Sequence, residues 1–258
     1  MKKLLVVLLT LLTLVGCSSG KVKGGDLDDI KSRGYIIVAM EGTWKPFTYH
    51  NEADELVGFD VEVAKYIADY LGVEVRYEEG EWDGLLMGIE NGRYDIMVNG
   101  CDRSEEREQT YDLSDAYGYD KVVVMTRGED DSINSVADLN GKTTANTISS
   151  TYAQIGIDNG ATVQGVDDLD QTIQLLLQER IDATINAEVV YLDYIDTNPE
   201  ANIKLACYTG DTYDIVIPMK KGSSALLTEV NKAIAQGHAD GTFKALSMKY
   251  FGIDLTTK

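Results

Sequence analysis

The chain has 258 residues, of which 44% are hydrophobic and 26% are charged, so it can build one large domain or two lobes around buried cores. Its formal net charge is −20, and a surface of this sign repels phosphate backbones and anionic headgroups. Composition therefore argues against nucleic acid as a partner. It also requires that any attachment to a membrane rest on something other than charge.

The chain begins with a secretory leader. Lys2 and Lys3 precede an apolar run over residues 4–15, which is too short for a helix that crosses a bilayer, since this needs about 20 residues. The sequence Leu-Val-Gly-Cys at 14–17 resembles a bacterial lipobox. We therefore expect a lipoprotein signal peptide over 1–16, a lipid on Cys17 and a flexible tether through residue 25, rather than an ordinary signal peptide with a chance cysteine.

Strand-like and helix-like patterns then alternate, which favours an α/β fold with mainly parallel sheet. Strands are predicted over 35–40, 73–77 and 95–99, with helices over 59–71 and 82–91 between them. From residue 121 a second set repeats this rhythm, with strands over 121–126, 143–147 and 183–186, a strand near Val163, and helices over 150–158, 167–177 and 188–198. A β-rich run over 213–219 and helices over 225–239 and 242–249 close the chain.

Two crossings of the chain, near 116–120 and 209–214, divide these elements into two lobes. Lobe 1 is expected to contain residues 26–117 and 215–258, and lobe 2 residues 118–214 with the crossings. A cleft between two lobes is a common place for a small ligand to bind.

Residues typical of catalytic and metal sites give little signal. His50 and His238 are too few, and too far from the cysteines, to predict zinc, and no phosphate-binding loop or nucleophile elbow occurs. Acidic clusters at 26–29 and 167–170 fit helix starts better than calcium loops. Cys101 and Cys207 could form a pair or remain free thiols. We expect no metal, no cofactor and no catalytic residue.

Short motifs follow one another along the whole mature chain. They are GTWKPF at 42–47, GFDV at 58–61, WDGL at 82–85, GRYD at 92–95, SEER at 104–107, YDLSDAY at 111–117, DLNGK at 138–142, ERIDA at 179–183 and KYFG at 249–252. Their order and spacing resemble the polar amino-acid substrate-binding proteins of ABC transporters, and most of all cystine-type members. The resemblance implies a two-lobed type II periplasmic-binding-protein fold with two crossover hinge segments.

The same resemblance assigns ligand contacts. Without the resemblance, Arg107 would be typical of a surface ion pair. Its position in the SEER motif implies instead that it binds the ligand's α-carboxylate, since a guanidinium offers two parallel donors to a carboxylate. Ser149, Ser150 and Thr151 precede a helix, whose backbone N–H groups suit the same carboxylate. Trp44 and Trp82 are expected to pack against the ligand side chain as aromatic walls of the site.

The partner of the ligand's ammonium departs from the family pattern. Where family members commonly place an aspartate, this chain has Ala187, while Asp102 replaces a usual serine, threonine or glycine. We expect Asp102 to bind the ammonium, with Glu188 as the alternative. Glu41 and Asn186 are expected at the ligand's distal end, and Gly100 completes the predicted ligand-binding set.

The resemblance therefore implies a monomeric, lipid-anchored protein on a Gram-positive-type cell surface. It would capture a polar amino acid such as cystine or glutamine and deliver it to an ABC permease in the membrane. Two alternatives stay open at this point: an enzyme on the same fold, similar to cyclohexadienyl dehydratase, and an extracellular amino-acid sensor. Which amino acid binds is not decided by the sequence.

Overall fold

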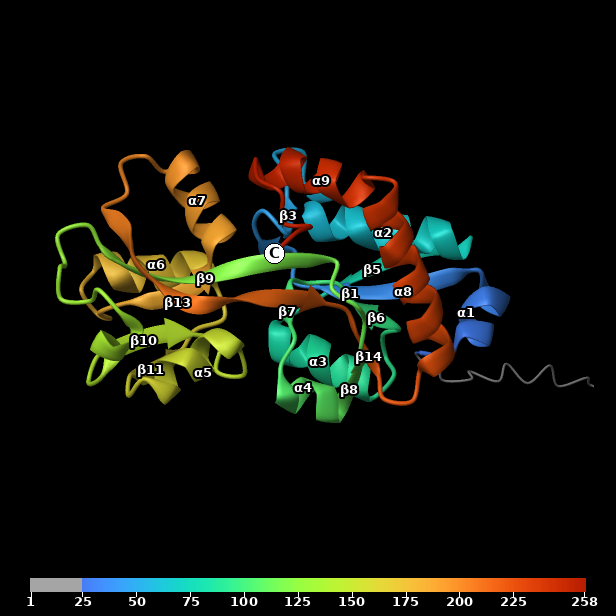
Figure 1. Cartoon of the computed structure of the whole chain (residues 1–258), viewed down its shortest axis with the longest axis horizontal. Helices are drawn as coiled ribbons and strands as arrows, with labels where there is room; N and C mark the ends of the chain where they lie inside the picture. The colour runs from blue at the N-terminus through green and yellow to red at the C-terminus, as the bar shows by residue number, and fades with distance from the viewer. Residues whose placement is uncertain (1–24) are drawn as a thin grey trace, which may run out of the picture.

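A computed structural model describes residues 25–258. The predicted signal peptide, Cys17 and the tether up to residue 24 lie outside this range. Figure 1 shows two groups of elements side by side, joined in the middle by the long strands β9 (Gly118–Arg127) and β13 (Ile203–Val216). The α/β architecture follows the prediction. We call the group that contains both the first and the last helix lobe 1, and the other lobe 2.

Lobe 1 is built on a five-stranded sheet with the order β5-β1-β6-β14-β8. Its strands are β1 (Tyr35–Met40), β5 (Glu74–Glu79), β6 (Ile96–Met97), β8 (Tyr111–Leu113) and β14 (Pro218–Lys220), and its helices are α1 (Leu27–Arg33), α2 (Phe59–Leu71), α3 (Trp82–Glu90), α4 (Glu105–Thr110), α8 (Ser224–Ala239) and α9 (Thr242–Phe251). A small antiparallel sheet of β2 (Thr43–Trp44), β3 (Thr48–His50) and β4 (Leu56–Val57) extends from it, and this was not predicted.

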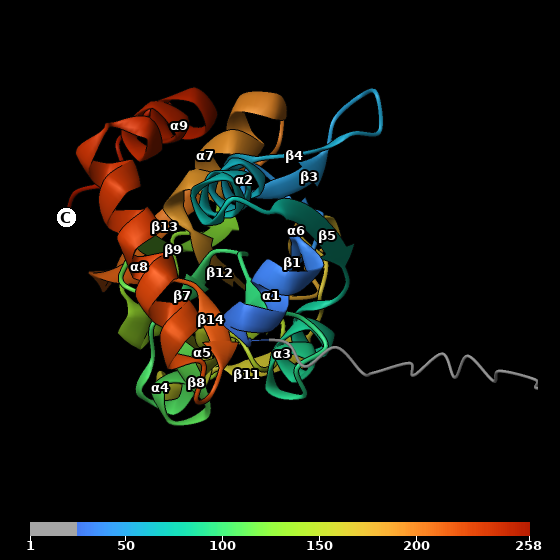
Figure 2. The same ribbon diagram turned by 90° about the vertical axis from the view of Figure 1, so that its right-hand side faces the viewer.

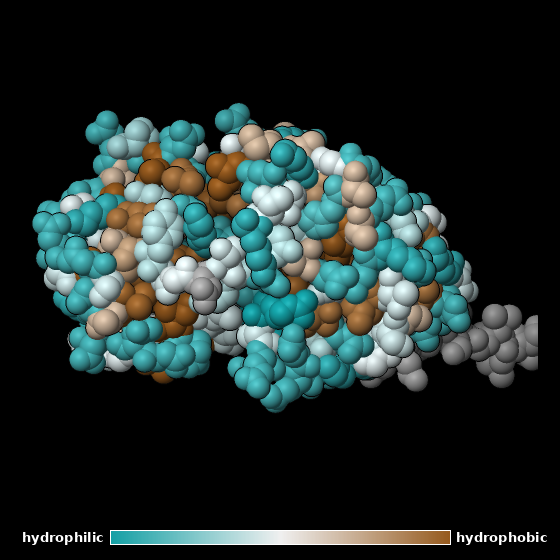
Figure 3. All heavy atoms as spheres, viewed as in Figure 1, coloured by the Kyte–Doolittle hydropathy of each residue, from teal (hydrophilic) through white to brown (hydrophobic). Residues whose placement is uncertain are grey.

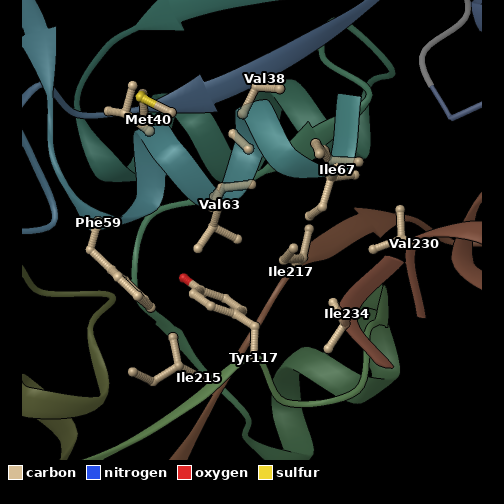
Figure 4. Packing of buried hydrophobic residues seen from close by; sticks show 14 of the residues in the cluster. Val38, Met40, Phe59, Val63, Ile67, Tyr117, Ile215, Ile217, Val230 and Ile234 are labelled. Atoms are coloured by element: carbon tan, nitrogen blue, oxygen red, sulfur yellow. The ribbon is translucent and has the colours of Figure 1, made fainter. Parts of the chain in front are cut away.

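The sheet of lobe 1 is buried on both faces, as a strand like β1 requires when nearly all its residues are apolar. Val38 and Met40 of β1 pack with α2, α8 and α9, whereas Ala39 packs with α3. Figure 2 shows α2 above β1 and α3 below it. Figure 4 shows Val63 and Ile67 of α2 pointing toward Ile217 and the apolar side of α8. Each such buried aliphatic side chain contributes about 1.5 to 3 kcal/mol to the free energy of unfolding.

Lobe 2 contains a four-stranded sheet with the order β12-β9-β13-β7 and a two-stranded parallel sheet of β10 and β11. Its remaining elements are β10 (Thr143–Asn146), β11 (Thr162–Gly165), β12 (Thr184–Ala187), α5 (Thr151–Asp158), α6 (Leu169–Leu177), α7 (Glu188–Thr197) and a 3₁₀ turn over Val136–Leu139, while β7 (Cys101–Asp102) joins from lobe 1. Side chains of β9 alternate between α6 on one face and α5 with the 3₁₀ turn on the other.

The expectation of mainly parallel sheet is wrong. All four strands of the β12-β9-β13-β7 sheet pair antiparallel, and β14 pairs antiparallel with β6 and β8. The reason is that the chain leaves lobe 1 along β9 and returns along β13, and two strands that run in opposite directions pair side by side. Only the β1, β5, β6 and β10, β11 ladders among the described strands are parallel.

The two crossings between the lobes are the paired strands β9 and β13. Lys121 of β9 pairs with Thr212 of β13, and the Tyr117 N–H donates to the Ile215 carbonyl at 3.0 Å. The predicted β-rich run at 213–219 is split, since β13 ends at Val216 and β14 begins at Pro218. The lobe boundaries at 117/118 and 214/215 stay predictions.

Most of the surface seen in Figure 3 is hydrophilic, with apolar side chains in small patches. Two acidic clusters act as predicted at helix starts: the Asp26 carboxylate accepts from the N–H groups of Asp28 and Asp29, and the Asp168 carboxylate from that of Gln171. Gly25, assigned to the tether, is already buried and donates its N–H to Asp95 at 3.2 Å.

Candidate functional site

A pocket lies between the two lobes and encloses about 590 Å³, including space open to solvent. Lobe 1 and β7 contribute one wall and lobe 2 the other. The lining residues are Glu41, Trp44, Trp82, Gly100, Asp102, Arg107, Asn146, Thr147, Ser150, Thr151, Tyr152, Val166, Asp167, Asp168, Leu169, Thr172, Thr184 and Asn186. Most of the predicted ligand-binding residues thus line one pocket, although they are spread over the chain from residue 41 to residue 186. Ser149 and Glu188 do not line it.

Arg107 is held in place from both ends. Ser104 caps α4, and its hydroxyl accepts the Arg107 N–H at 3.2 Å. At the other end, Nη1 donates to the Asp102 carbonyl at 2.8 Å, and the guanidinium lies 5.1 Å from the centre of the Trp82 ring. Arg107 is buried, and within residues 25–258 no carboxylate forms a salt bridge with it. Its positive charge is therefore available to an anion that enters the pocket.

Asp102 lies beside Arg107 and is also buried, with 6% of its surface exposed. Its carboxylate accepts a hydrogen bond from the Thr151 hydroxyl of lobe 2. Burial raises the pKa of the Asp102 carboxyl, although Arg107 and the Thr151 hydrogen bond act to lower it. A buried carboxylate of this kind favours a cation as its partner.

Glu188, the alternative partner for an ammonium, is engaged elsewhere. It is the first residue of α7, and its carboxylate accepts a hydrogen bond from the Tyr208 hydroxyl of β13. The Tyr208 side chain is 47% exposed, so this pair sits at the surface. Of the two carboxylates considered for the ammonium, Asp102 was the predicted partner, and it lines the pocket whereas Glu188 does not.

The turn at the start of α5 behaves differently at each of its three residues. Ser150 caps the helix, because its hydroxyl accepts the Ala153 N–H at 3.1 Å. Thr151 reaches Asp102, and the exposed Ser149 donates instead to the Asp83 carboxylate of α3. The hydrogen bonds of Thr151 and Ser149 therefore join lobe 2 to lobe 1.

A further contact joins the lobes on another side of the pocket: Lys45 forms an ion pair with Asp193 of α7 at 3.2 Å. Together with the bonds of Ser149 and Thr151, this pair holds the two lobes in contact around the pocket. The described arrangement is therefore a closed one.

The two tryptophans have different surroundings. Trp44 stacks on Phe47 with ring centres 4.3 Å apart, and its edge abuts Gly100, where an added Cβ would lie 2.2 Å from Trp44 Cζ3. Trp82 is buried beside Arg107. Both rings line the pocket, so either can contact a ligand side chain.

Asp60 supports this wall from behind. It is fully buried on α2, and its carboxylate accepts from the Gly100 N–H at 2.6 Å and from the Tyr117 hydroxyl at 2.8 Å. Gly100 has φ of +54°, a left-handed conformation that residues with a Cβ rarely adopt. Asp60 therefore fixes the path of the segment that carries Gly100 and Asp102.

Several pocket residues were missed by sequence reasoning, above all Asn146 and Asp167. Asn146 ends β10, and Asp167 lies two residues after β11, at the same edge of a parallel pair. Ligands gather at the carboxyl ends of parallel strands. The predicted strands at 143–147 and near Val163 therefore contained a usable signal.

Cys101 and Cys207 are free thiols. No group of three or more potential metal ligands occurs within the described range. None of its helices is both long enough and apolar enough to span a membrane.

Comparison with known proteins gives consistent results. The family model of bacterial extracellular solute-binding proteins, family 3, matches residues 36–253. The L-cystine-binding protein TcyA of Bacillus subtilis is 36% identical over 99% of this chain and 100% of its own length. Among solved structures, an ancestral arginine-binding protein bound to arginine has a TM-score of 0.80 at 34% identity and covers 85% of this chain and 99% of its own. The L-cystine solute receptor of Neisseria gonorrhoeae in an unliganded open conformation has a TM-score of 0.62 at 34% identity, covering 90% and 99%.

Proposed function

Because the chain belongs to the bacterial extracellular solute-binding proteins, family 3, we propose that it captures a polar amino acid between its lobes and delivers it to an ABC importer. One observation carries this proposal: the buried Arg107, free of ion pairs among the described residues, lies beside the buried Asp102 carboxylate in a single pocket. An α-amino acid presents a carboxylate and an ammonium on the same carbon atom. Arg107 and Asp102 match these two charges in sign and in proximity.

Binding and closure follow from where the residues lie. Arg107, Asp102 and Trp82 all come from lobe 1 or the adjoining β7, so the amino acid can bind the open protein through these groups first. Lobe 2 then brings the start of α5 over the ligand, and Thr151 reaches Asp102. The ligand drives this motion only by its tighter binding to the closed form.

The comparisons support a binding role. Relatives that are 30% or more identical over nearly the whole of this chain include the L-cystine-binding proteins TcyA and TcyJ and two probable amino-acid-binding proteins. Their names support a solute-binding role rather than catalysis. The higher TM-score to an arginine-bound structure than to an open unliganded one, at equal identity, agrees with the contacts that hold the lobes together here.

Attachment to the cell surface completes the proposal. A lipid on Cys17 and a short tether would keep the monomer near its permease on a Gram-positive-type cell, where no outer membrane confines it. Replacing Cys17 with alanine should move the protein from the membrane fraction to the medium without changing its affinity for the amino acid. If the Cys17→Ala protein stays in the membrane fraction, the lipid anchor is wrong, but the proposed amino-acid binding is not affected.

The site itself is tested by exchanging one carboxylate at a time. Asp102→Asn should weaken amino-acid binding about tenfold or more in isothermal titration calorimetry, since a hydrogen bond between charged groups contributes about 1.5 to 3 kcal/mol. Glu188→Gln is the matched control and should bind as tightly as the unchanged protein. If Glu188→Gln loses affinity while Asp102→Asn does not, the ammonium partner is wrongly assigned. If none of the twenty amino acids or cystine binds, the proposed function is wrong.

A further inference from the structure

Three residues that line the pocket have side-chain oxygen atoms that accept no hydrogen bond from the described residues. Glu41 follows β1 and lies on lobe 1, whereas Asn146 and Asp167 lie at the ends of strands on lobe 2. We call these three residues the distal subsite. None of the three is needed for the main chain of an amino acid, which the Arg107 and Asp102 pair accounts for.

Asn146 provides the clearest evidence that a ligand donor is needed here. Its side chain is 94% buried, and Nδ2 donates to the Ile185 carbonyl at 2.7 Å, which fixes the orientation of the amide. Oδ1 is then a buried acceptor with no hydrogen-bond partner among residues 25–258. Buried acceptors without partners are rare in native proteins, because each one costs free energy.

The two carboxyl groups of the subsite also lack donors for some of their oxygen atoms. One Glu41 oxygen accepts from Asn99 Nδ2 at 2.7 Å, and the described residues offer no donor to the other oxygen. Burial and the nearby Asp167 raise the pKa of Glu41 to about 7, against the opposing effect of the Asn99 hydrogen bond. Closing the lobes thus brings Glu41 toward the charge of Asp167, which disfavours the ionised form of Glu41, whereas a cation bound between the two would favour it.

The charge balance of the whole pocket points the same way. Among the described lining residues, Arg107 is the only positively charged one, and its single charge is balanced by that of Asp102. Asp168 is used as the cap of α6. The carboxyl groups of Glu41 and Asp167 remain without a partner of opposite charge once the carboxylate and ammonium of the ligand's main chain have been matched.

We propose that the amino acid carries a second positively charged nitrogen group, an ammonium or a guanidinium, that is bound by Glu41, Asn146 and Asp167. This inference rests on the proposed function, since Arg107 and Asp102 must hold the main chain. Such a group supplies several N–H donors and a positive charge, as the distal subsite requires. Cystine also carries a second ammonium, but beside a second carboxylate that would find no further cation in the described lining, so we expect a ligand whose distal group is only cationic to bind more tightly.

The test compares ligands that differ mainly in the charge of the distal group. L-arginine is titrated against L-citrulline, and L-lysine against L-norleucine, with L-cystine and L-glutamine as further ligands. We expect at least one charged ligand to bind about tenfold or more tightly than its neutral counterpart, because a charge-assisted bond is lost with the charge.

Variants of the protein then locate the effect. Glu41→Gln and Asp167→Asn should each reduce the ratio of charged to neutral affinity severalfold and leave the neutral ligand's affinity unchanged or higher. Asp196→Asn, an exposed residue on α7, removes the same charge far from the lining and should leave the ratio unchanged. Thermal melts of each variant without ligand check that it is folded.

The outcomes separate the two proposals. If neutral and charged ligands bind equally, the distal subsite is wrong while amino-acid capture stands. A ratio that survives in both Glu41→Gln and Asp167→Asn also overturns the assignment of the subsite. If no amino acid binds at all, the proposed function fails and this inference fails with it.

Discussion

The buried Asp60 carboxylate should make the free energy of unfolding fall as the pH rises. No salt bridge joins Asp60 to a cation within residues 25–258, and burial raises its pKa from 3.8 to about 7, although the hydrogen bonds from Tyr117 and Gly100 lower it. The folded protein therefore favours the protonated acid. The resulting stabilisation is fully present below pH 3.8 and is lost as the pH rises through about 7.

The size of this effect follows from the two pKa values. With 1.36 kcal/mol for each pH unit, a pKa of about 7 in the folded chain and 3.8 in the unfolded chain removes about 3 kcal/mol between pH 5 and pH 8. Asp60→Asn has the shape of the protonated acid and does not titrate. Its amide oxygen can still accept the Gly100 N–H, while its amide nitrogen faces the Tyr117 hydroxyl.

Urea unfolding of the ligand-free protein at pH 5 and pH 8 measures the effect as a double difference. The loss of stability between the two pH values should be about 3 kcal/mol larger in the unchanged protein than in Asp60→Asn, because the comparison cancels the contributions of other titrating groups. Asp196→Asn, an exposed aspartate that water solvates in both states, is the matched control. A double difference within about 0.5 kcal/mol of zero, or of opposite sign, would refute the reasoning.

Three further predictions concern the pocket wall and its closure. Arg107→Lys should weaken amino-acid binding about tenfold or more in calorimetry, because one ammonium cannot offer two parallel donors to a carboxylate, and equal affinity would contradict the assigned contact. Gly100→Ala should lower the free energy of unfolding by about 2 to 4 kcal/mol, since its φ is +54° and its Cβ would lie 2.2 Å from the Trp44 ring, whereas an unchanged urea midpoint would count against this packing. Thr151→Ala removes the hydrogen bond to Asp102 between the lobes, so ligand affinity should fall about tenfold. Small-angle scattering should then show less closure at equal ligand concentration, and full closure would argue against this role of Thr151.

Local pattern was enough to predict most helices and strands. The predicted helix over 59–71 is observed as Phe59–Leu71, and the predicted strand over 35–40 as Tyr35–Met40. Both have a clear apolar period, and Gly72 ends the helix with φ of +68°. The direction of pairing was not predictable, because β9 and β13 are nearly eighty residues apart and their local sequences carry no record of which strand lies beside them.

The candidate site divides in the same way. The sequence by itself determined which residues could bind an amino acid, because Arg107, Trp44 and Trp82 stand in motifs of fixed spacing. Only the tertiary structure decided which carboxylates face the pocket, since it buries Asp102 beside Arg107 and turns Glu188 toward Tyr208. It also placed Asn146 and Asp167 opposite Glu41. The physical reason is that periodicity and capping report neighbours within a few residues, whereas burial and charge pairing depend on atoms that the folded chain brings together from distant segments.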